Sequence, residues 1–147
     1  MSDSRVYQFV DTNILVYAFD RSAGTKHEIA RDHVAKLWED ELGCLSIQVL
    51  QEFYVIATQK IRTPLAPKQA AKVIADFGQW RVHSPSVRDV QFAIEIQTRY
   101  QVSFWDAMIL CSAVQLGCDR LWTEDLNPGQ RYMNVQVANP LIGDPGS

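Results

Sequence analysis

The distribution of apolar and polar positions divides the chain into short strands and longer helices. Residues 6–10 form a short apolar run that stops at Asp11-Thr12-Asn13, residue types suited to a turn or a helix start. Further short strands are predicted at residues 44–45, 81–82, 120–122 and 135–137. The segments between them are long enough for helices, so the pattern predicts strands and helices in alternation.

Apolar residues three and four positions apart predict five helices. These cover residues 27–42, 46–60, 67–77, 86–100 and 103–117. Ser46, Ser86 and Ser103 are placed to cap three of the helix starts, and an aspartate three residues after Ser86 and Ser103 completes a capping-box pattern in both. Gly43 and Gly117 are expected to end the helices that precede them.

Short strands that alternate with longer helices indicate an α/β fold of three layers, with a short-stranded, mainly parallel central sheet flanked by helices. At 147 residues the chain has the usual size of one domain. We expect a single domain over residues 1–141, and a disordered tail or expression remnant over residues 142–147. The longest apolar runs are too short for a signal core or a membrane span, so we expect a cytoplasmic protein with no membrane contact.

Composition and charge change this picture little. Hydrophobic residues make up 47% of the sequence, as in ordinary globular domains. The net charge of -3 speaks against a large basic surface for nucleic acid, but if four of the 17 acidic residues are metal ligands, the remaining charges nearly balance. The three cysteines (Cys44, Cys111 and Cys118) have no metal-binding spacing and are predicted to be reduced core thiols.

Four acidic residues occupy positions that a parallel sheet brings together. Asp11 and Asp125 follow strands, Asp106 opens a helix, and Glu52 lies one to two turns into the helix after the second strand. In such folds the functional cleft lies beyond the carboxyl ends of the strands, so these carboxylates are expected to converge. Carboxylates without histidine are the ligands that Mg²⁺ or Mn²⁺ prefers.

Four segments in the order of the chain resemble the conserved blocks of PIN domains, especially those of VapC-like toxins. They are Val10-Asp11-Thr12-Asn13, residues 45–53 around Glu52, residues 103–109 around Asp106, and Trp122-Thr123-Glu124-Asp125-Leu126. The resemblance implies that the catalytic and metal-binding acids are Asp11, Glu52, Asp106 and Asp125. It also implies that Thr12, Asn13 and Thr123 contact these acids or metal-bound water.

The fourth block contains two adjacent acids, Glu124 and Asp125. Asp125 is preferred because the acid of the family falls two residues after its serine or threonine. Both assignments stay open from the residues alone.

The resemblance further implies a Mg²⁺- or Mn²⁺-dependent endoribonuclease that cleaves single-stranded or loop RNA to leave a 5′-phosphate and a 3′-hydroxyl. Asp11, Asp106 and Glu52 would hold the ion that activates water, and Asp125 would help a second ion or orient the water. A VapC-like toxin would be a homodimer, blocked by a small antitoxin protein.

Other functions fit parts of the pattern. A degenerate PIN domain would only bind RNA or protein, and a PIN nuclease of RNA processing would have no antitoxin. An aspartyl phosphatase would need an acid where Asn13 stands, and a receiver domain would need paired acids at the first strand and a late lysine, yet no lysine follows Lys72. Taken singly, each of the four acids could also be a turn, cap or surface residue.

Several other residues are predicted to have structural roles. His27, His33 and His83 lack metal-ligand spacing and are predicted to be ordinary helix-face or loop residues. Trp105 is expected to pack in the core, with stacking on a base as its alternative. Lys60, Arg62, Arg99 and Arg131 are expected on the solvated surface, with contact to RNA phosphates as their alternative.

Overall fold

Six short strands form one sheet in the order β3-β2-β1-β4-β6-β5 in the computed structural model, which describes residues 6–142. Neighbouring strands are parallel except for β5, which runs antiparallel to β6. The strands are β1 (Gln8–Val10), β2 (Gly43–Ser46), β3 (Arg81–His83), β4 (Arg120–Trp122), β5 (Arg131–Tyr132) and β6 (Val135–Ala138). The predicted α/β class with a mainly parallel sheet is confirmed.

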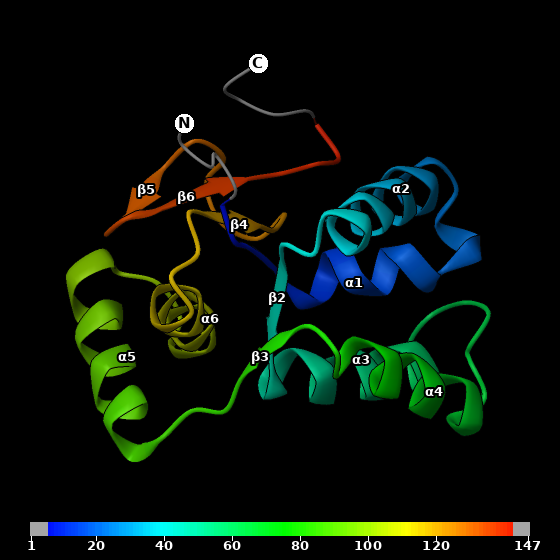
Figure 1. The fold of residues 1–147 in the computed structure, drawn as a ribbon, viewed down its shortest axis with the longest axis horizontal. Helices are drawn as coiled ribbons and strands as arrows, with labels where there is room; N and C mark the ends of the chain where they lie inside the picture. Colours follow the sequence, from blue (N-terminus) through cyan, green and yellow to red (C-terminus); the bar gives the residue numbers. More distant parts are fainter. Residues whose placement is uncertain (1–5, 143–147) are drawn as a thin grey trace.

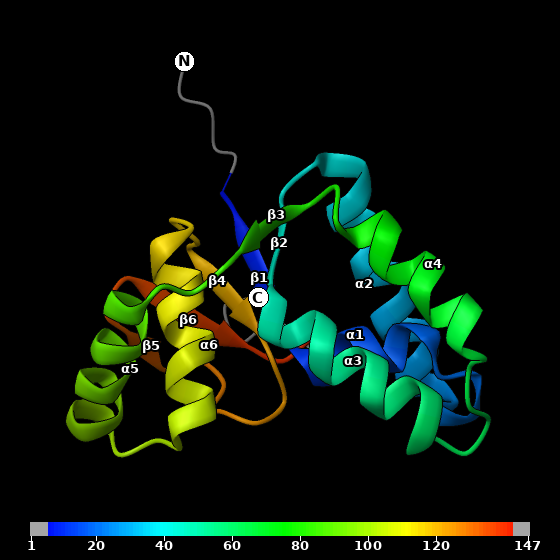
Figure 2. The same cartoon turned by 90° about the horizontal axis from the view of Figure 1, so that it is seen from below.

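Helices cover both faces of this sheet (Figures 1 and 2). They are α1 (Thr12–Phe19), α2 (Thr25–Asp40), α3 (Ile47–Gln59), α4 (Pro67–Phe77), α5 (Val87–Tyr100) and α6 (Phe104–Gln115), with a short 3₁₀ turn at Arg21–Ala23. Figure 2 shows α1 to α4 on one side of the sheet and the α5–α6 pair on the other. No helix within residues 6–142 combines the length and apolar character needed to span a membrane.

The serine caps that the sequence predicts are present. The hydroxyls of Ser46, Ser86 and Ser103 accept hydrogen bonds from backbone N–H groups in the first turns of α3, α5 and α6. Each cap fixes where a helix begins after a strand or loop, because it satisfies one of the N–H groups that the first turn leaves without a partner. The starts of α3 and α6 place Glu52 and Asp106 at the carboxyl edge of the sheet.

Two local predictions need correction. Helix α1 was not predicted, because five of its eight residues are buried and it lacks the alternating polar face of a surface helix. Gly43 does not end α2; the helix ends at Asp40, and Glu41 takes the left-handed conformation instead (φ 58°). Gly43 lies inside β2, where the ring of Trp80 fills the space that a side chain would need.

The core lies between the sheet and its two helical layers. Its fully buried members include Phe9, Leu45, Phe53 and Leu110, which come from the central strands and from α3 and α6. A rigid core on both faces holds the strand ends in place, so side chains that follow β1 and β4 have fixed positions. The predicted tail at residues 142–147 lies outside the described residues except for Ile142, and the domain boundary at residue 141 stays a prediction.

Candidate active site

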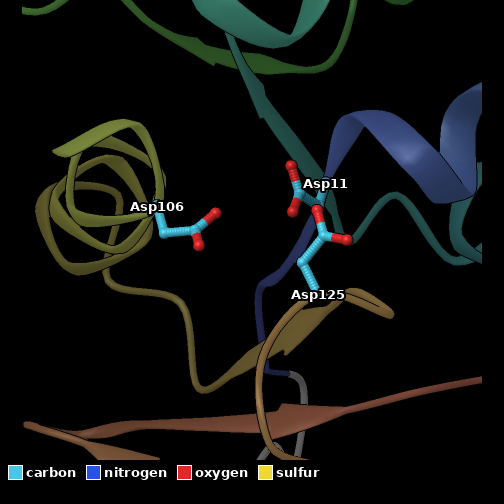
Figure 3. Close-up of side chains that lie close together, drawn as sticks. All are labelled: Asp11, Asp106 and Asp125. Atoms are coloured by element: carbon cyan, nitrogen blue, oxygen red, sulfur yellow. The ribbon is translucent and has the colours of Figure 1, made fainter. Parts of the chain in front are cut away.

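Three aspartates gather at the carboxyl edge of the sheet (Figure 3). Asp11 follows β1, Asp125 follows the neighbouring strand β4, and Asp106 lies in the first turn of α6. One carboxylate oxygen from each lies within 4.8 Å of the others. Figure 3 shows the carboxylates of Asp11 and Asp125 side by side and that of Asp106 directed toward them.

Asp11 is buried, and each of its two carboxylate oxygens accepts one hydrogen bond. Its Oδ1 accepts from the backbone N–H of Thr12 (2.7 Å), and its Oδ2 accepts from the hydroxyl of Thr123 (2.8 Å). Burial nevertheless raises the pKa of Asp11 to about 7, with a further upward contribution from Asp125 and Asp106, against the lowering effect of the two hydrogen bonds. A nearby cation would relieve this unfavourable charge.

Asp125 is more exposed and is held by its neighbours. Asn13 donates from Nδ2 to Asp125 Oδ2 (2.9 Å), and the backbone N–H of Asp125 donates to the hydroxyl oxygen of Thr123 (3.0 Å). Asn13 also contacts Thr123 (3.3 Å). Thr12, Asn13 and Thr123, the three supporting residues named from the sequence, therefore each contact one or more of the acids.

Glu124, the other acid of the fourth block, turns away from the group. Its Oε1 accepts from the hydroxyl of Tyr17 (2.7 Å), and its Oε2 lies 3.6 Å from the ammonium of Lys26. The structure therefore joins Asp125, and not Glu124, with Asp11 and Asp106. The partners of Glu124 lie in α1 and α2, and these contacts separate it from Asp125, the acid preferred from its position two residues after Thr123.

Asp106 differs from the matching aspartate of α5. Asp89 closes its capping box, since its Oδ2 accepts from the backbone N–H of Ser86 (2.8 Å). Asp106 makes only one half of the predicted capping box: its backbone N–H donates to the Ser103 hydroxyl (3.1 Å), but its carboxylate accepts no hydrogen bond from the Ser103 N–H. Its carboxylate therefore faces the acid group. Burial is the main cause that raises the pKa of Asp106, and the charges of Asp125 and Glu52 raise it further, while the Ser103 hydroxyl lowers it.

Glu52 faces the same cavity but lies outside the group of three. Its Oε1 accepts a 2.6 Å hydrogen bond from the hydroxyl of Thr12, and its Oε2 accepts from Gln48 Nε2 (3.4 Å). Gln48 precedes Glu52 by four residues on α3, a spacing that places both on one helix face. Gln48 was not predicted as a site residue from the sequence, although its spacing from Glu52 could have identified it.

The acids line a cavity of about 570 Å³. Its wall is completed by residues of α1, α3 and α6 and by Lys60, which directly follows α3: Thr12, Asn13, Gln48, Gln51, Glu52, Val55, Ile56, Lys60, Trp105 and Ile109. Trp105 is 62% exposed here, so the expectation that it packs in the core is wrong. The surface position of Lys60 agrees with prediction, and it supplies the cationic side chain of the wall.

Three clustered carboxylates without histidine form a donor set for a hard divalent cation. Oxygen ligands of this kind suit Mg²⁺ or Mn²⁺, which also bind phosphate oxygens. Without a cation, three like charges this close oppose one another, and this repulsion adds to the larger effect of burial in raising the pKa of Asp11 and of Asp106. The residues present therefore fit a cation that binds phosphate.

The histidines lie outside this cavity. His83 joins the end of β3 to two helices through Asp89 (3.0 Å) and Ser112 (2.7 Å). His33 packs edge-on against Trp122, with ring centres 4.1 Å apart, and burial lowers its pKa to about 4. Neither histidine lines the acid cavity; His33 lies on helix α2 as predicted, whereas His83 lies in β3 and not on a helix face or in a loop.

Comparison with known proteins identifies the family. The family model of the PIN domain matches residues 8–131. The chain therefore belongs to the PIN-domain family, as the four sequence blocks predicted. No curated protein matches it.

Solved structures share the fold. A toxin–antitoxin complex from Klebsiella pneumoniae matches with a TM-score of 0.68 at 18% identity, covering 90% of this chain and 97% of that one. DNA-bound VapBC from Salmonella typhimurium matches with a TM-score of 0.64 at 18% identity, over 92% and 98% of the two chains. VapC20 of Mycobacterium tuberculosis, a toxin that cleaves the sarcin–ricin loop, matches with a TM-score of 0.57 at 20% identity, over 78% and 86%.

Proposed function

We propose that the protein is a metal-dependent endoribonuclease and the toxin of a toxin–antitoxin pair. The observation that carries the proposal is the meeting of Asp11, Asp106 and Asp125 within 4.8 Å in an open cavity. Membership of the PIN family and the likeness to toxin structures support the same function. The substrate would be RNA in single-stranded or loop form, whose backbone can enter such a cavity.

The residues divide the work in this proposal. Asp11, Asp106 and Asp125 hold Mg²⁺ or Mn²⁺, while Asn13 and Thr123 keep Asp125 and Asp11 in position. Such an ion, when bound, would lower the pKa of a water molecule and place positive charge beside the attacked phosphate.

Glu52 has a different place in this scheme. Because its carboxylate is held by Thr12 and Gln48 at the side of the group, we assign it to positioning the attacking water from the α3 wall.

Cleavage of a fluorescent single-stranded RNA by the purified protein tests the proposal. We expect cleavage in Mg²⁺ or Mn²⁺, none in excess EDTA, and a 5′-phosphate on the downstream product. Asp125→Asn should abolish cleavage, whereas Glu124→Gln, its neighbour in the sequence, should retain most of it. Full activity in EDTA from protein free of contaminating nuclease would remove the metal mechanism.

An antitoxin partner is proposed because the similar structures include toxin–antitoxin complexes. An apolar groove between α1, α2 and α4, lined by Phe19, Val34, Trp38 and Phe77, offers a partner segment a place to bind. Co-expression with the protein of the adjacent reading frame should give a stable complex with reduced nuclease activity. A Trp38→Asp variant that binds this partner as tightly as wild type would exclude the groove.

A homodimer is the second proposed assembly. Helix α5 presents Val87, Val90 and Ile94 to solvent, 78%, 39% and 50% exposed, at positions that form one apolar stripe. A second copy would cover this stripe. Light scattering at micromolar concentration should give twice the chain mass for wild type and a monomer for Ile94→Asp; a wild-type monomer contradicts the dimer and leaves the catalytic proposal untouched.

A further inference from the structure

Trp105 is an exposed residue in the wall of the acid cavity. It is the residue before Asp106, and it is 62% exposed, more than any of the other three tryptophans. A large flat ring left in water beside a group of carboxylates is unusual, since an indole gains free energy by leaving water. A ligand with a flat apolar face would give it a partner.

The surroundings hold Trp105 in place without covering it. Its ring meets Phe104 in an edge contact, with centroids 5.1 Å apart and planes at 73°. Gln48 donates from Nε2 to the backbone oxygen of Trp105 (3.4 Å) and also to Glu52 Oε2 (3.4 Å), which links the α6 wall of the cavity to the α3 wall. Among residues 6–142, the indole N–H of Trp105 has no hydrogen-bond partner.

The rest of the cavity supplies the other contacts that a nucleic-acid strand needs. With a cation bound, the acids would offer a place for one phosphate, and the exposed side chain of Lys60, which directly follows α3, offers a positive charge for another. No ion pair engages Lys60 within the described part of the chain. Exposed aromatic rings beside a charged track are how proteins bind unpaired bases, because every base has a face that can stack.

We propose that Trp105 is a stacking platform for an unpaired nucleobase next to the phosphate that lies at Asp11, Asp106 and Asp125. The inference rests on the proposed ribonuclease function and adds a residue that selects single-stranded substrate. A base inside a duplex is stacked on both sides and has no free face for the ring, so Trp105 discriminates against paired RNA.

A binding experiment without cleavage tests the stacking directly. The ¹⁵N-labelled protein gives one indole cross-peak for each of its four tryptophans, and Trp105→Phe identifies the peak of Trp105. Titration with adenosine 5′-monophosphate in Mg²⁺ should shift this peak, while ribose 5-phosphate, which lacks the base, should shift it at least several-fold less. Trp38 is the internal control, because it is 40% exposed and lies in the groove of α1, α2 and α4.

Kinetics on a cleaved RNA give a second readout. Trp105→Ala should lower kcat/KM by about tenfold or more, mainly through KM, and Trp105→Phe by only about threefold, because phenylalanine still stacks. An abasic nucleotide beside the cleaved bond should lower kcat/KM of the wild type by a similar factor. The same substrate should lower kcat/KM of Trp105→Ala only slightly further. The two changes would then be coupled, as expected when they remove the same contact.

Several outcomes would overturn the assignment. Equal shifts with ribose 5-phosphate, equal shifts at Trp38, or fully additive losses in the abasic series would each show that no base stacks on Trp105. A loss of oligomer mass for Trp105→Ala in light scattering would make it an interface residue instead. If the wild type cleaves no RNA, the proposed function fails, yet the nucleotide titration still decides whether Trp105 binds a base.

Discussion

The hydroxyl of Thr123 donates a 2.8 Å hydrogen bond to Oδ2 of Asp11 across 112 residues of sequence. The same oxygen accepts from the backbone N–H of Asp125 and from Asn13 Nδ2. A hydroxyl has a single proton, so these two incoming bonds direct that proton toward Asp11. Thr123 thereby fixes the buried acid of β1 and the exposed acid after β4 relative to one another.

Removing this hydroxyl should weaken both folding and catalysis. We expect Thr123→Val, which keeps the side-chain shape, to lower the free energy of unfolding by about 1–3 kcal/mol, because buried polar partners lose their hydrogen bond. The loss should be larger at pH 8, where Asp11 is ionised, than at pH 5. Urea unfolding at both pH values measures it, with Thr98→Val on the exposed side of α5 as the control; equal losses for both variants would contradict the role of Thr123.

The raised pKa of Asp11 predicts a pH dependence of the metal-free protein. The folded protein keeps this proton up to about pH 7, whereas the unfolded chain releases it near 3.8, so ionisation between these values costs stability. The stabilising contribution is complete below the unfolded pKa and is lost as the pH rises through about 7. The corresponding loss in the free energy of unfolding is on the order of a few kcal/mol.

The measurement is the difference in unfolding free energy between wild type and Asp11→Asn in EDTA. We expect the wild type to lose stability relative to Asp11→Asn as the pH rises from 4 to 8. Comparing variants is necessary because the lowered pKa of His33 acts in the opposite direction, costing stability as the pH falls from 6.5 toward 4. A difference that stays flat would show that Asp11 titrates normally.

Asp106 and Asp89 form a matched pair for separating catalysis from helix capping. Asp89→Asn should lower stability by about 1–2 kcal/mol, because it loses charge-assisted bonds to the Ser86 N–H and to His83, and should keep RNA cleavage. Asp106→Asn should melt at the same or a higher temperature, since it removes one of several like charges, while cleavage falls by orders of magnitude. A lower melting temperature with retained cleavage for Asp106→Asn would show that Asp106 serves the helix cap and not catalysis.

Metal binding should stabilise the folded protein. A cation that binds only the folded state adds about 2.7 kcal/mol at 100 times its dissociation constant. We expect Mn²⁺ to raise the melting temperature of wild type, and to raise that of Asp106→Asn less. Asp89→Asn should respond like wild type, and an equal response from all three proteins would place the binding site elsewhere.

The sequence predicted best those elements whose signals are local. The serine caps of α3, α5 and α6 lie next in sequence to the turns that they stabilise, so the local sequence pattern located them. Helix α1 was not predicted because a helix that is buried on most sides has no polar face, and its sequence therefore lacks the helical alternation of polar and apolar residues. Gly43 was misread because the reason for glycine there, the ring of Trp80, comes from a segment far along the chain.

For the acid group too, local signals could be predicted from the sequence and tertiary contacts could not. That the acids share one edge could be predicted, since they follow strands or open helices of a parallel sheet. Which acid of the fourth block joins it depends on Tyr17 and Lys26, which hold Glu124 aside through tertiary contacts. The exposure of Trp105 could not be predicted either. Helix α6 packs against α5 on one side, and its first turn is open on another. The apolar sequence around Trp105 does not show which of these sides its ring occupies.

The pairing of β1 with β4 also governs when activity can arise during synthesis. Asp11 leaves the ribosome early, but its partners Asp106 and Asp125 come from the last third of the chain. A nascent polypeptide therefore carries an incomplete acid group until β4 has been translated and has docked beside β1. Under the proposed function, we therefore expect a chain that stops before Asp125 to lack nuclease activity, because its acid group is incomplete.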